Sequence, residues 1–290
     1  MMETESSNYS FTCIPQVPFG IAQLEKNTCF FNAALQSFST AFLEVFCSKY
    51  TVESHYKFIR LVFQLLTECH NSESNCRQLL ELMMINKQFS TFKIGSMDDS
   101  FLFLRCLVST FQDENEEFYK EFTIVREMRE NECVCCELQY ESKTYPPMYY
   151  LQNETNVQEQ VTILIESGKI CSICEKRLEC KMEYPTIFLF STRKEVLRMQ
   201  IDISITVEEN YYYLCGISCS TGIHAVSISF RNGRWYLCND QSVRLYHPNI
   251  IGNIFLLEKY YLPLGLVYLR RPHPPLLLPE DTNTTCCDLM

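Results

Sequence analysis

Apolar residues recur every three or four positions through the first part of the chain, a spacing that predicts amphipathic helices. Between Cys29 and Phe46 the repeat is carried by Phe31, Leu35, Phe38, Phe42 and Phe46. The same period continues in "HYKFIRLVFQLLTEC", "CRQLLELMMI" and "MDDSFLFLRCLVSTF". Residues 29 to about 111 are therefore expected to form a helical region.

After the charged stretch "QDENEEFYKEF" the pattern changes to short runs that are typical of β-strands. The candidates are "YPTIFLFS", "IDISITV", "YYYLCGIS", "HAVSISF" and "RWYLC". Helices followed by strands in this way predict an α+β fold, with a helical N-terminal half packed on an antiparallel-sheet C-terminal half. The last residues, "RRPHPPLLLPEDTNTTCCDLM", are rich in proline and polar residues, which indicates a tail outside the core.

Composition limits the classes of partner. The chain has 290 residues, 47% of them apolar, which is enough to bury a substantial core. Its formal net charge is −10, and no stripe of basic residues with interleaved aromatics occurs, so nucleic-acid binding is not expected. A basic or neutral protein partner fits this charge better.

Two observations bear on location. The N-terminus lacks a signal-peptide pattern. The most apolar late stretch, residues 250–269, contains Glu258 and Lys259, so no integral membrane segment is expected. We therefore expect a cytoplasmic protein, with the nucleus not excluded. In that reducing environment the seventeen cysteines predict free thiols, metal ligands or a nucleophile rather than disulfides.

Cys29 falls at the first turn of a predicted helix. Unpaired backbone N–H groups and the positive helix end favour an anion at this place, and a thiol there becomes more nucleophilic. A buried structural cysteine is the alternative interpretation of this feature alone. Most of the other cysteines are expected to be small buried side chains of that kind.

The residues after His224 predict a β-hairpin. The strand "HAVSISF" alternates apolar residues with serines, Asn232-Gly233 supplies a two-residue type I′ turn, and "RWYLCND" returns. With that turn Val226 opposes Asn239, so Asn239 is a diagonal neighbour of His224 and its amide can orient the imidazole. Asp240 then points to the other face, although a β-bulge would exchange the two residues. A structural strand histidine is the alternative.

Two C-x-x-C pairs predict a metal site. Cys133 and Cys136 form the first pair, and Cys171 and Cys174 form the second. This arrangement suits a zinc ribbon in which four thiolates hold one structural Zn²⁺. Cys135 lies inside the first pair and could replace a ligand, and unmetallated thiols are the alternative in a chain so rich in cysteine.

These residues together resemble the ubiquitin-specific protease family. "GIAQLEKNTCFFN" is similar to the family's Cys box, G-L-x-N-L-G-N-T-C-Y-x-N, and "SMDDSFLFLRCLVSTF" to its Q-Q-D-A-x-E-F-L helix. The C-x-x-C pairs resemble the family's zinc-holding fingers, and "MEYPTIFLFSTRK" resembles the strand that follows them. "GIHAVSISFRNGRWYLCNDQSV" resembles the His box and "LGLVYLRR" the closing strand, so the landmarks occur in the family's order.

The resemblance implies a papain-like cysteine protease fold of thumb, fingers and palm, with the ubiquitin tail in the cleft between the thumb and the palm. The expected boundaries follow from the landmarks: an N-terminal tail at 1–16, a catalytic domain at 17–271 and a Pro-rich C-terminal tail at 272–290. Within the catalytic domain the thumb covers about 17–125, the zinc-binding fingers about 126–182 and the palm about 183–271.

By the same resemblance Cys29 is the nucleophile and His224 its base. Asn239 falls on the third triad position and Asp240 on the second acidic position, and Cys–His–Asn triads occur in other proteases. Gln23 stands where the family has its oxyanion-hole asparagine, and its longer amide could still donate a hydrogen bond.

Asp99 matches the aspartate of the helix motif and is assigned to substrate binding. Two family residues that help to hold the basic tail of ubiquitin are replaced here by Leu102 and Ala225. We expect a thiol-dependent deubiquitinase that cleaves the isopeptide bond after the C-terminal glycine of ubiquitin, with ubiquitin or ubiquitinated proteins as partners. A catalytically impaired ubiquitin-binding protein is the alternative, and a protease for a small ubiquitin-like modifier is a third interpretation for which no residue argues.

The C-terminus carries one further motif. Cys287-Asp288-Leu289-Met290 fits the C-a-a-X prenylation pattern, although Asp288 is unusual where an aliphatic residue is common. A single lipid at Cys287 would give only a weak anchor. We therefore expect a soluble protein.

Overall fold

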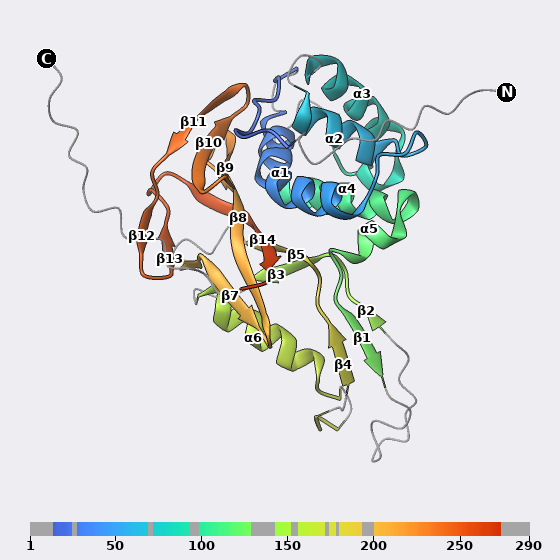
Figure 1. The fold of residues 1–290 in the computed structure, drawn as a ribbon, viewed down its shortest axis with the longest axis vertical. Coiled ribbons are helices and arrows are strands. Elements are labelled where there is room, and N and C mark those ends of the chain that lie inside the picture. The colour runs from blue at the N-terminus through green and yellow to red at the C-terminus, as the bar shows by residue number, and fades with distance from the viewer. Residues whose placement is uncertain are drawn as a thin grey trace, which may run out of the picture.

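The fold has a helical half packed against a sheet, with a narrow ribbon projecting from the body (Figure 1). The structure is a computed structural model that describes residues 14–24, 28–68, 72–92, 99–128, 143–151, 156–171, 174–177, 180–192 and 200–273. The predicted α+β fold, with helices in the N-terminal half and strands in the C-terminal half, is confirmed.

The helical half is built around one central helix. Its elements are α1 (Cys29–Lys49), α2 (Phe58–Thr67), α3 (Ser72–Ile85), the short 3₁₀ helix η3 (Lys87–Phe89), α4 (Ser100–Glu114) and α5 (Glu116–Lys120). Helix α1 is buried on nearly every side, because other helices cover one side and the sheet covers the other. The phenylalanine repeat of the sequence forms this core: the rings of Phe42 and Phe46 stack with centroids 5.5 Å apart, and Phe118 packs edge-on against both.

The main sheet has eight strands. Seven of them lie in the order β11-β10-β9-β8-β14-β5-β3, and the remaining strand, β7, pairs with β8. All pairs are antiparallel except β3 with β5. The bounds are β3 (Met148–Leu151), β5 (Ile187–Thr192), β7 (Ser204–Val207), β8 (Asn210–Ser220), β9 (Ala225–Arg231), β10 (Arg234–Asn239), β11 (Ser242–Tyr246) and β14 (Leu262–Arg271).

Both faces of this sheet are covered. Along β5, Ile187 and Leu189 join the apolar cluster around α1, whereas Phe188 and Phe190 join a second cluster on the opposite face. A strand buried on both faces gives a continuous apolar run in the sequence. The second cluster includes residues of α6 (Val157–Gly168), β6 (Ile201–Asp202) and β13 (Ile254–Leu256). Strand β12 (Asn249–Ile251) is exposed and pairs with β13 to complete a small sheet.

Two details differ from the sequence-based prediction. The region expected to form only fingers contains helix α6, whose Val157, Val161 and Ile165 are buried at helical spacing. The single strand expected over residues 201–207 is divided into β6 and β7, which pair with different partners. The division follows from Asn253, whose backbone oxygen accepts from the N–H of Ile203.

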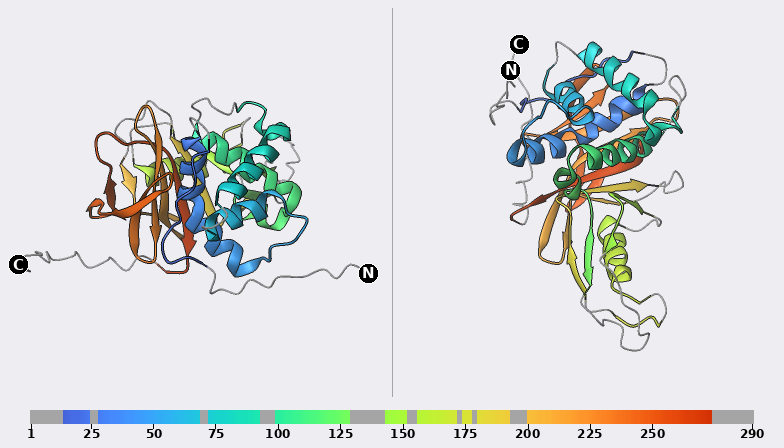
Figure 2. Two further views of the ribbon diagram at one scale, coloured as in Figure 1. Left: turned by 90° about the horizontal axis from the view of Figure 1, so that it is seen from above. Right: turned by 90° about the vertical axis from the view of Figure 1, so that its right-hand side faces the viewer.

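The projecting ribbon is a three-stranded sheet of β1 (Val125–Met128), β2 (Lys143–Thr144) and β4 (Cys180–Glu183), in the order β2-β1-β4. It extends away from helices α1–α5 and the main sheet (Figure 2). Within the ranges that the structure describes, no helix combines the length and the apolar character that a membrane crossing requires.

Candidate active site

Cys29 is the first residue of α1, and its side chain is buried, with 4% of its surface exposed. The helix lies directly on the sheet. At Gly216 of β8 even a methyl group would come within 1.8 Å of the backbone oxygen of Ser37, so the close approach requires glycine there. Thr40 adds a 2.6 Å hydrogen bond to the backbone oxygen of Phe230 in β9. The position of the thiol is therefore fixed relative to β8 and β9.

The thiol of Cys29 meets the start of β9. The backbone N–H of Ala225 donates to Sγ of Cys29, with 3.4 Å between the two atoms. Ala225 directly follows His224 in the chain. Two residues that are far apart in sequence, the predicted nucleophile and the predicted base, are thus brought together by the packing of α1 on the sheet.

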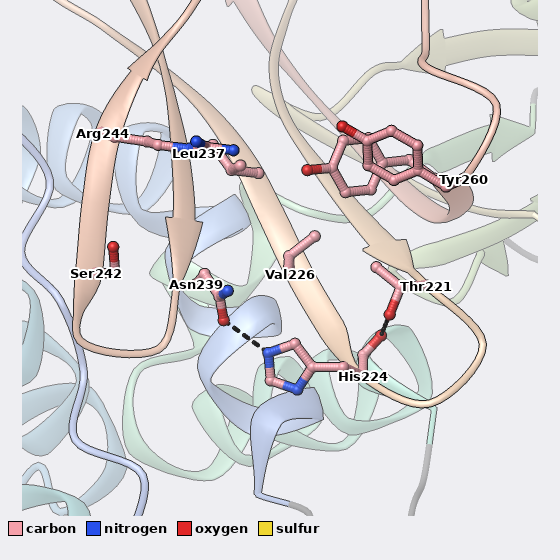
Figure 3. A pocket seen from close by; sticks show the side chains of 9 residues that line it. Thr221, His224, Val226, Leu237, Asn239, Ser242, Arg244 and Tyr260 are labelled. Atoms are coloured by element: carbon pink, nitrogen blue, oxygen red, sulfur yellow. Dashed lines mark hydrogen bonds between the residues drawn. The ribbon is translucent and has the colours of Figure 1, made fainter.

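The imidazole of His224 is held by Asn239. Nε2 of His224 lies 2.7 Å from Oδ1 of Asn239, and the side chains point toward one another in the close view (Figure 3). A carbonyl oxygen can only accept, so Nε2 is the nitrogen that carries hydrogen. In a neutral ring that leaves Nδ1 unprotonated and able to accept a proton.

The hairpin has the predicted register. Asn232 and Gly233 both have a positive φ, 50° and 74°, as a type I′ turn requires. Cys238 lies opposite Ser227 in the β9–β10 pair, which continues the register expected from that turn. The contact of Asn239 with His224 agrees with that register. Asp240 departs from the prediction: its carboxylate, expected on the other face, lies 3.6 Å from Nε2 of His224, because the backbone turns into the left-handed region at this residue.

Asp240 lies at the end of β10 in the left-handed region, with φ of 50°, and contacts both halves of the site. Its Oδ1 accepts a 2.6 Å hydrogen bond from the amide of Asn32, and its backbone oxygen accepts one of 3.0 Å from the amide of Gln36. Its Oδ2 lies 3.6 Å from Nε2 of His224. Asp240 therefore connects the histidine hairpin to the helix that begins at Cys29.

Sequence reasoning missed the structural roles of Asn32 and Gln36. Both are polar side chains buried almost completely on α1, one helical turn apart. Buried amides require hydrogen-bond partners, and polar residues on the otherwise apolar face of a predicted helix were the only available signal. The partner, Asp240, is more than two hundred residues away.

The chain before Cys29 also packs closely. A Cβ at Gly20 would lie 2.1 Å from the backbone oxygen of Gln241, so only glycine fits where this segment crosses the β10–β11 turn. The backbone N–H of Ile21 donates to the oxygen of Asp240 over 3.0 Å. The glycine that matched the Cys box therefore has a steric reason to be there.

Gln23 and Asp99 have less direct relations to the thiol. Gln23 is exposed, and none of the hydrogen bonds among the described residues joins its side chain to Cys29 or His224. The Asp99 carboxylate caps α4, accepting from the N–H groups of Phe101 and Leu102 over 2.7 and 3.2 Å. The oxyanion role of Gln23 and the substrate role of Asp99 stay predictions.

Two of the four predicted metal ligands can be described. Cys171 is buried and Cys174 half-buried in one tight turn, in which the N–H of Glu175 donates to the oxygen of Cys171 over 3.0 Å. Cys133 and Cys136 lie outside the described residues. Among the residues that are described, no group of three or more metal-binding side chains gathers at one place. The zinc site stays a prediction.

Four other buried thiols are poor nucleophiles. Burial raises the pKa of Cys76 and of Cys238 to about 12, and it raises the pKa of Cys215 and Cys219 further. These groups remain protonated at neutral pH, and a protonated thiol is a weak nucleophile.

Comparison with known proteins gives a structural result. No protein-family model matches the chain, and a comparison with curated proteins found no match. Among solved structures, the Ubp8/Sgf11/Sus1/Sgf73 module of SAGA, a deubiquitinating (DUB) module bound to monoubiquitin, matches with a TM-score of 0.54. The identity is 12%, over 89% of this chain and 72% of that chain.

A second structure, the same module bound to ubiquitin aldehyde, matches with a TM-score of 0.55 and 12% identity over 90% of this chain and 71% of that chain. The chain has the fold of the Ubp8 deubiquitinase. The expected similarity to ubiquitin-specific proteases is therefore confirmed for the fold. At this level of identity the likeness does not extend to activity, which depends on the residues of the site.

Proposed function

We propose that this protein is a thiol-dependent deubiquitinase that hydrolyses the isopeptide bond after the C-terminal glycine of ubiquitin. The observation that carries the proposal is the meeting of Cys29, at the N-terminus of α1, with the start of the strand that follows His224. Asn239 holds the His224 ring through a hydrogen bond with Nε2, which leaves Nδ1 as the proton acceptor. A nucleophile, a base and an orienting group are the parts that thiol hydrolysis needs.

In the first half of the reaction, Nδ1 of His224 takes the proton of the Cys29 thiol. The thiolate attacks the carbonyl carbon of ubiquitin's last glycine, forming a C–S bond and a tetrahedral oxyanion. The C–N bond then breaks, and His224 returns the proton to the leaving lysine amine. In the second half, His224 deprotonates a water that attacks the thioester, which releases ubiquitin and restores the thiol.

The oxyanion needs hydrogen-bond donors. The backbone N–H of Cys29, among the unpaired N–H groups that begin α1, is one candidate, and the amide of Gln23 is the second. Each correctly placed donor can contribute about 3 kcal/mol to the transition state. Because Gln23 is exposed, its side chain would have to turn toward the thiol when substrate binds.

The parts of the fold suggest how ubiquitin would bind. We assign helices α1–α5 to the thumb, the main sheet to the palm and the ribbon of β1, β2 and β4 to the fingers. The tail of ubiquitin would then lie between α4, which begins at Asp99, and the sheet. The two similar structures are bound to monoubiquitin and to ubiquitin aldehyde, which supports a ubiquitin partner here.

We further propose one structural Zn²⁺ at the end of the ribbon, held by Cys133, Cys136, Cys171 and Cys174. Support comes from the strand register: Met128, the last residue of β1, lies opposite Cys180, the first of β4. The two chain segments that carry the cysteine pairs therefore leave the ribbon from adjacent positions. Four thiolates would close the coordination sphere, so the ion would stabilise the fingers and take no part in catalysis.

One alternative has an observation in its favour. The hydrogen bond to Sγ of Cys29 comes from the backbone of Ala225, and no hydrogen bond among the described residues joins the thiol to the His224 ring. Together with the exposed Gln23, this arrangement suits a protein that binds ubiquitin and hydrolyses its conjugates slowly or not at all. Catalytic hydrogen bonds are often long before substrate binds, so hydrolysis remains the preferred function.

Turnover decides between the two. We expect the purified chain to release the fluorophore from a ubiquitin C-terminal amide, and Cys29→Ala to abolish release while leaving the fold intact. Cys47→Ala is the matched control, because this half-buried thiol lies at the other end of the same helix, and it should retain activity. Tight ubiquitin binding without release by the unmodified chain would favour the alternative.

A further inference from the structure

A cavity of about 510 Å³ opens beside the His224–Asn239 pair. Its floor is formed by Val226 and Leu237, which belong to the apolar cluster on the face of the sheet opposite α1. A volume of this size lies in the range of small-ligand sites, about 300–1,000 Å³. The cavity therefore flanks the catalytic pair on the side away from the helix that begins at Cys29 (Figure 3).

The charge of this cavity differs from that of the chain. Nine residues line it, and they include one arginine, Arg244 of β11, and no aspartate or glutamate. Arg244 is exposed, and no ion pair with it occurs in the part of the chain that the structure describes. In a protein with a net charge of −10, the space next to the catalytic histidine thus presents an unpaired cation.

Hydroxyl groups complete the lining. Ser242 lies opposite Asn239 in the β10–β11 pair, and Tyr260 faces Arg244 across the cavity (Figure 3). The hydroxyl of Tyr260 donates to the carboxylate of Glu258, which is not itself a lining residue. Of the acids beside the lining residues, Glu258 accepts from Tyr260 and Asp240 accepts from Asn32. Arg244 forms no ion pair among the described residues, so it remains available to an incoming anion.

The mechanism indicates which part of a substrate reaches this place. His224 protonates the leaving lysine amine, so that lysine must end beside the imidazole. Because the cavity begins at His224, residues that flank the lysine in the ubiquitinated protein lie within reach of it. The tail of ubiquitin, in contrast, is assigned to the cleft between the helices and the sheet.

We propose that this cavity binds an acidic side chain of the ubiquitinated protein, close to the modified lysine, with Arg244 as its cationic partner. The inference rests on the deubiquitinase function proposed above and adds the substrate class: lysines flanked by aspartate, glutamate or a phosphorylated residue. A guanidinium pairs with carboxylate and phosphate oxygens through two parallel hydrogen bonds, which suits it to either anion.

The first test compares two conjugates in which ubiquitin is joined to the lysine of a short peptide, flanked either by glutamates or by glutamines. The full chain should cleave the acidic conjugate about fivefold faster in kcat/KM, as expected for one partly exposed charge pair. Arg244→Gln should reduce that ratio to about one, and Arg244→Lys should keep part of it. Arg234→Gln, at an exposed arginine near the hairpin turn, is the matched control and should leave the ratio unchanged.

The second test does not depend on turnover. Equilibrium binding of the two conjugates is measured with the Cys29→Ala chain and with the Cys29→Ala, Arg244→Gln double variant. Tighter binding of the acidic conjugate that is lost in the double variant supports the site, even if the unmodified chain hydrolyses nothing and the proposed function fails. Equal binding of both conjugates overturns the inference. It is also overturned if inorganic phosphate binds at Arg244 while the two conjugates bind with equal affinity.

Discussion

The carboxylate of Asp240 accepts a 2.6 Å hydrogen bond from the side-chain amide of Asn32, which lies three residues after Cys29 in α1. The other carboxylate oxygen of Asp240 lies 3.6 Å from Nε2 of His224. One side chain therefore touches both the helix of the nucleophile and the ring of the base. The relative position of thiol and imidazole depends on this contact.

Loss of the Asp240 carboxylate should destabilise the fold. Asn32 is fully buried, so Asp240→Ala leaves its amide short of an acceptor, at a cost of about 1–3 kcal/mol. Asp240→Asn keeps an oxygen at this place and tolerates the positive φ, so it should lose much less. Unfolding by denaturant measures both variants, and equal losses for the two would show that the hydrogen bond to Asn32 is not the stabilising contact.

Asn239 should affect catalysis more than stability. It is exposed and reaches the reaction only through the His224 ring, so it is a positioning residue. We expect Asn239→Ala to lower kcat/KM about tenfold to a hundredfold, because the base loses its orientation, and Asn239→Asp to restore most of the rate by keeping an acceptor. A silent Asn239→Ala together with an impaired Asp240→Ala would reverse the two assignments.

Local patterns predicted the elements that carry the site. The phenylalanine spacing located α1, and the Asn232-Gly233 turn fixed the register that brings Asn239 to His224, because both signals depend only on neighbouring residues. The contact of Asn32 with Asp240 could not be predicted in this way. It depends on how α1 lies on the sheet, which is decided by packing across the whole chain, including the close approach at Gly216.

The residues between the two cysteine pairs were predicted to belong to zinc-binding fingers because of the C-x-x-C motifs, and helix α6 was missed for that reason. The spacing of Val157, Val161 and Ile165 was a helical signal within that region. The cavity beside His224 could not be predicted from the sequence either, because Arg244 and Tyr260 come to line it only after three separate segments have folded together.

Removal of metal should destabilise the ribbon. If the four cysteines hold zinc, the purified protein contains one Zn²⁺ per chain, and Cys171→Ser loses both the ion and part of the fold, because structural metal binding is coupled to folding. Cys219→Ala is the control, since this buried thiol lies in the main sheet and should leave the zinc content unchanged. An elemental analysis that finds no stoichiometric zinc would contradict the proposed site.

The ion pair between Glu121 and Lys49 should make stability depend on pH. The two groups are 2.6 Å apart, and Tyr50 donates a second hydrogen bond to the same carboxylate over 3.0 Å. Burial opposes ionisation, but the bonds from Lys49, Thr186 and Tyr50 outweigh it and lower the pKa of Glu121. A carboxyl whose pKa is lower in the folded state stabilises the fold above its unfolded pKa, about 4.3, and this contribution is lost as the pH falls through the folded value.

Glu121→Gln provides the measurement. The variant should be less stable than the unmodified chain by about 1 kcal/mol near pH 7, an amount typical of a partly exposed pair. The difference should shrink as the pH is lowered below about 4. Unfolding free energies of both proteins across this range test the sign, and a difference that grows toward acid would contradict it.

Cys29, as proposed above, is the nucleophile that attacks the C-terminus of ubiquitin. Ubiquitin carrying a C-terminal electrophile tests this role most directly, because the reagent combines recognition with thiol attack. We predict one covalent adduct per chain, located at Cys29 by peptide mass spectrometry among the seventeen cysteines, and no adduct with Cys29→Ala. An unlabelled Cys29, or an adduct at another cysteine while Cys29 remains free, would contradict the claim.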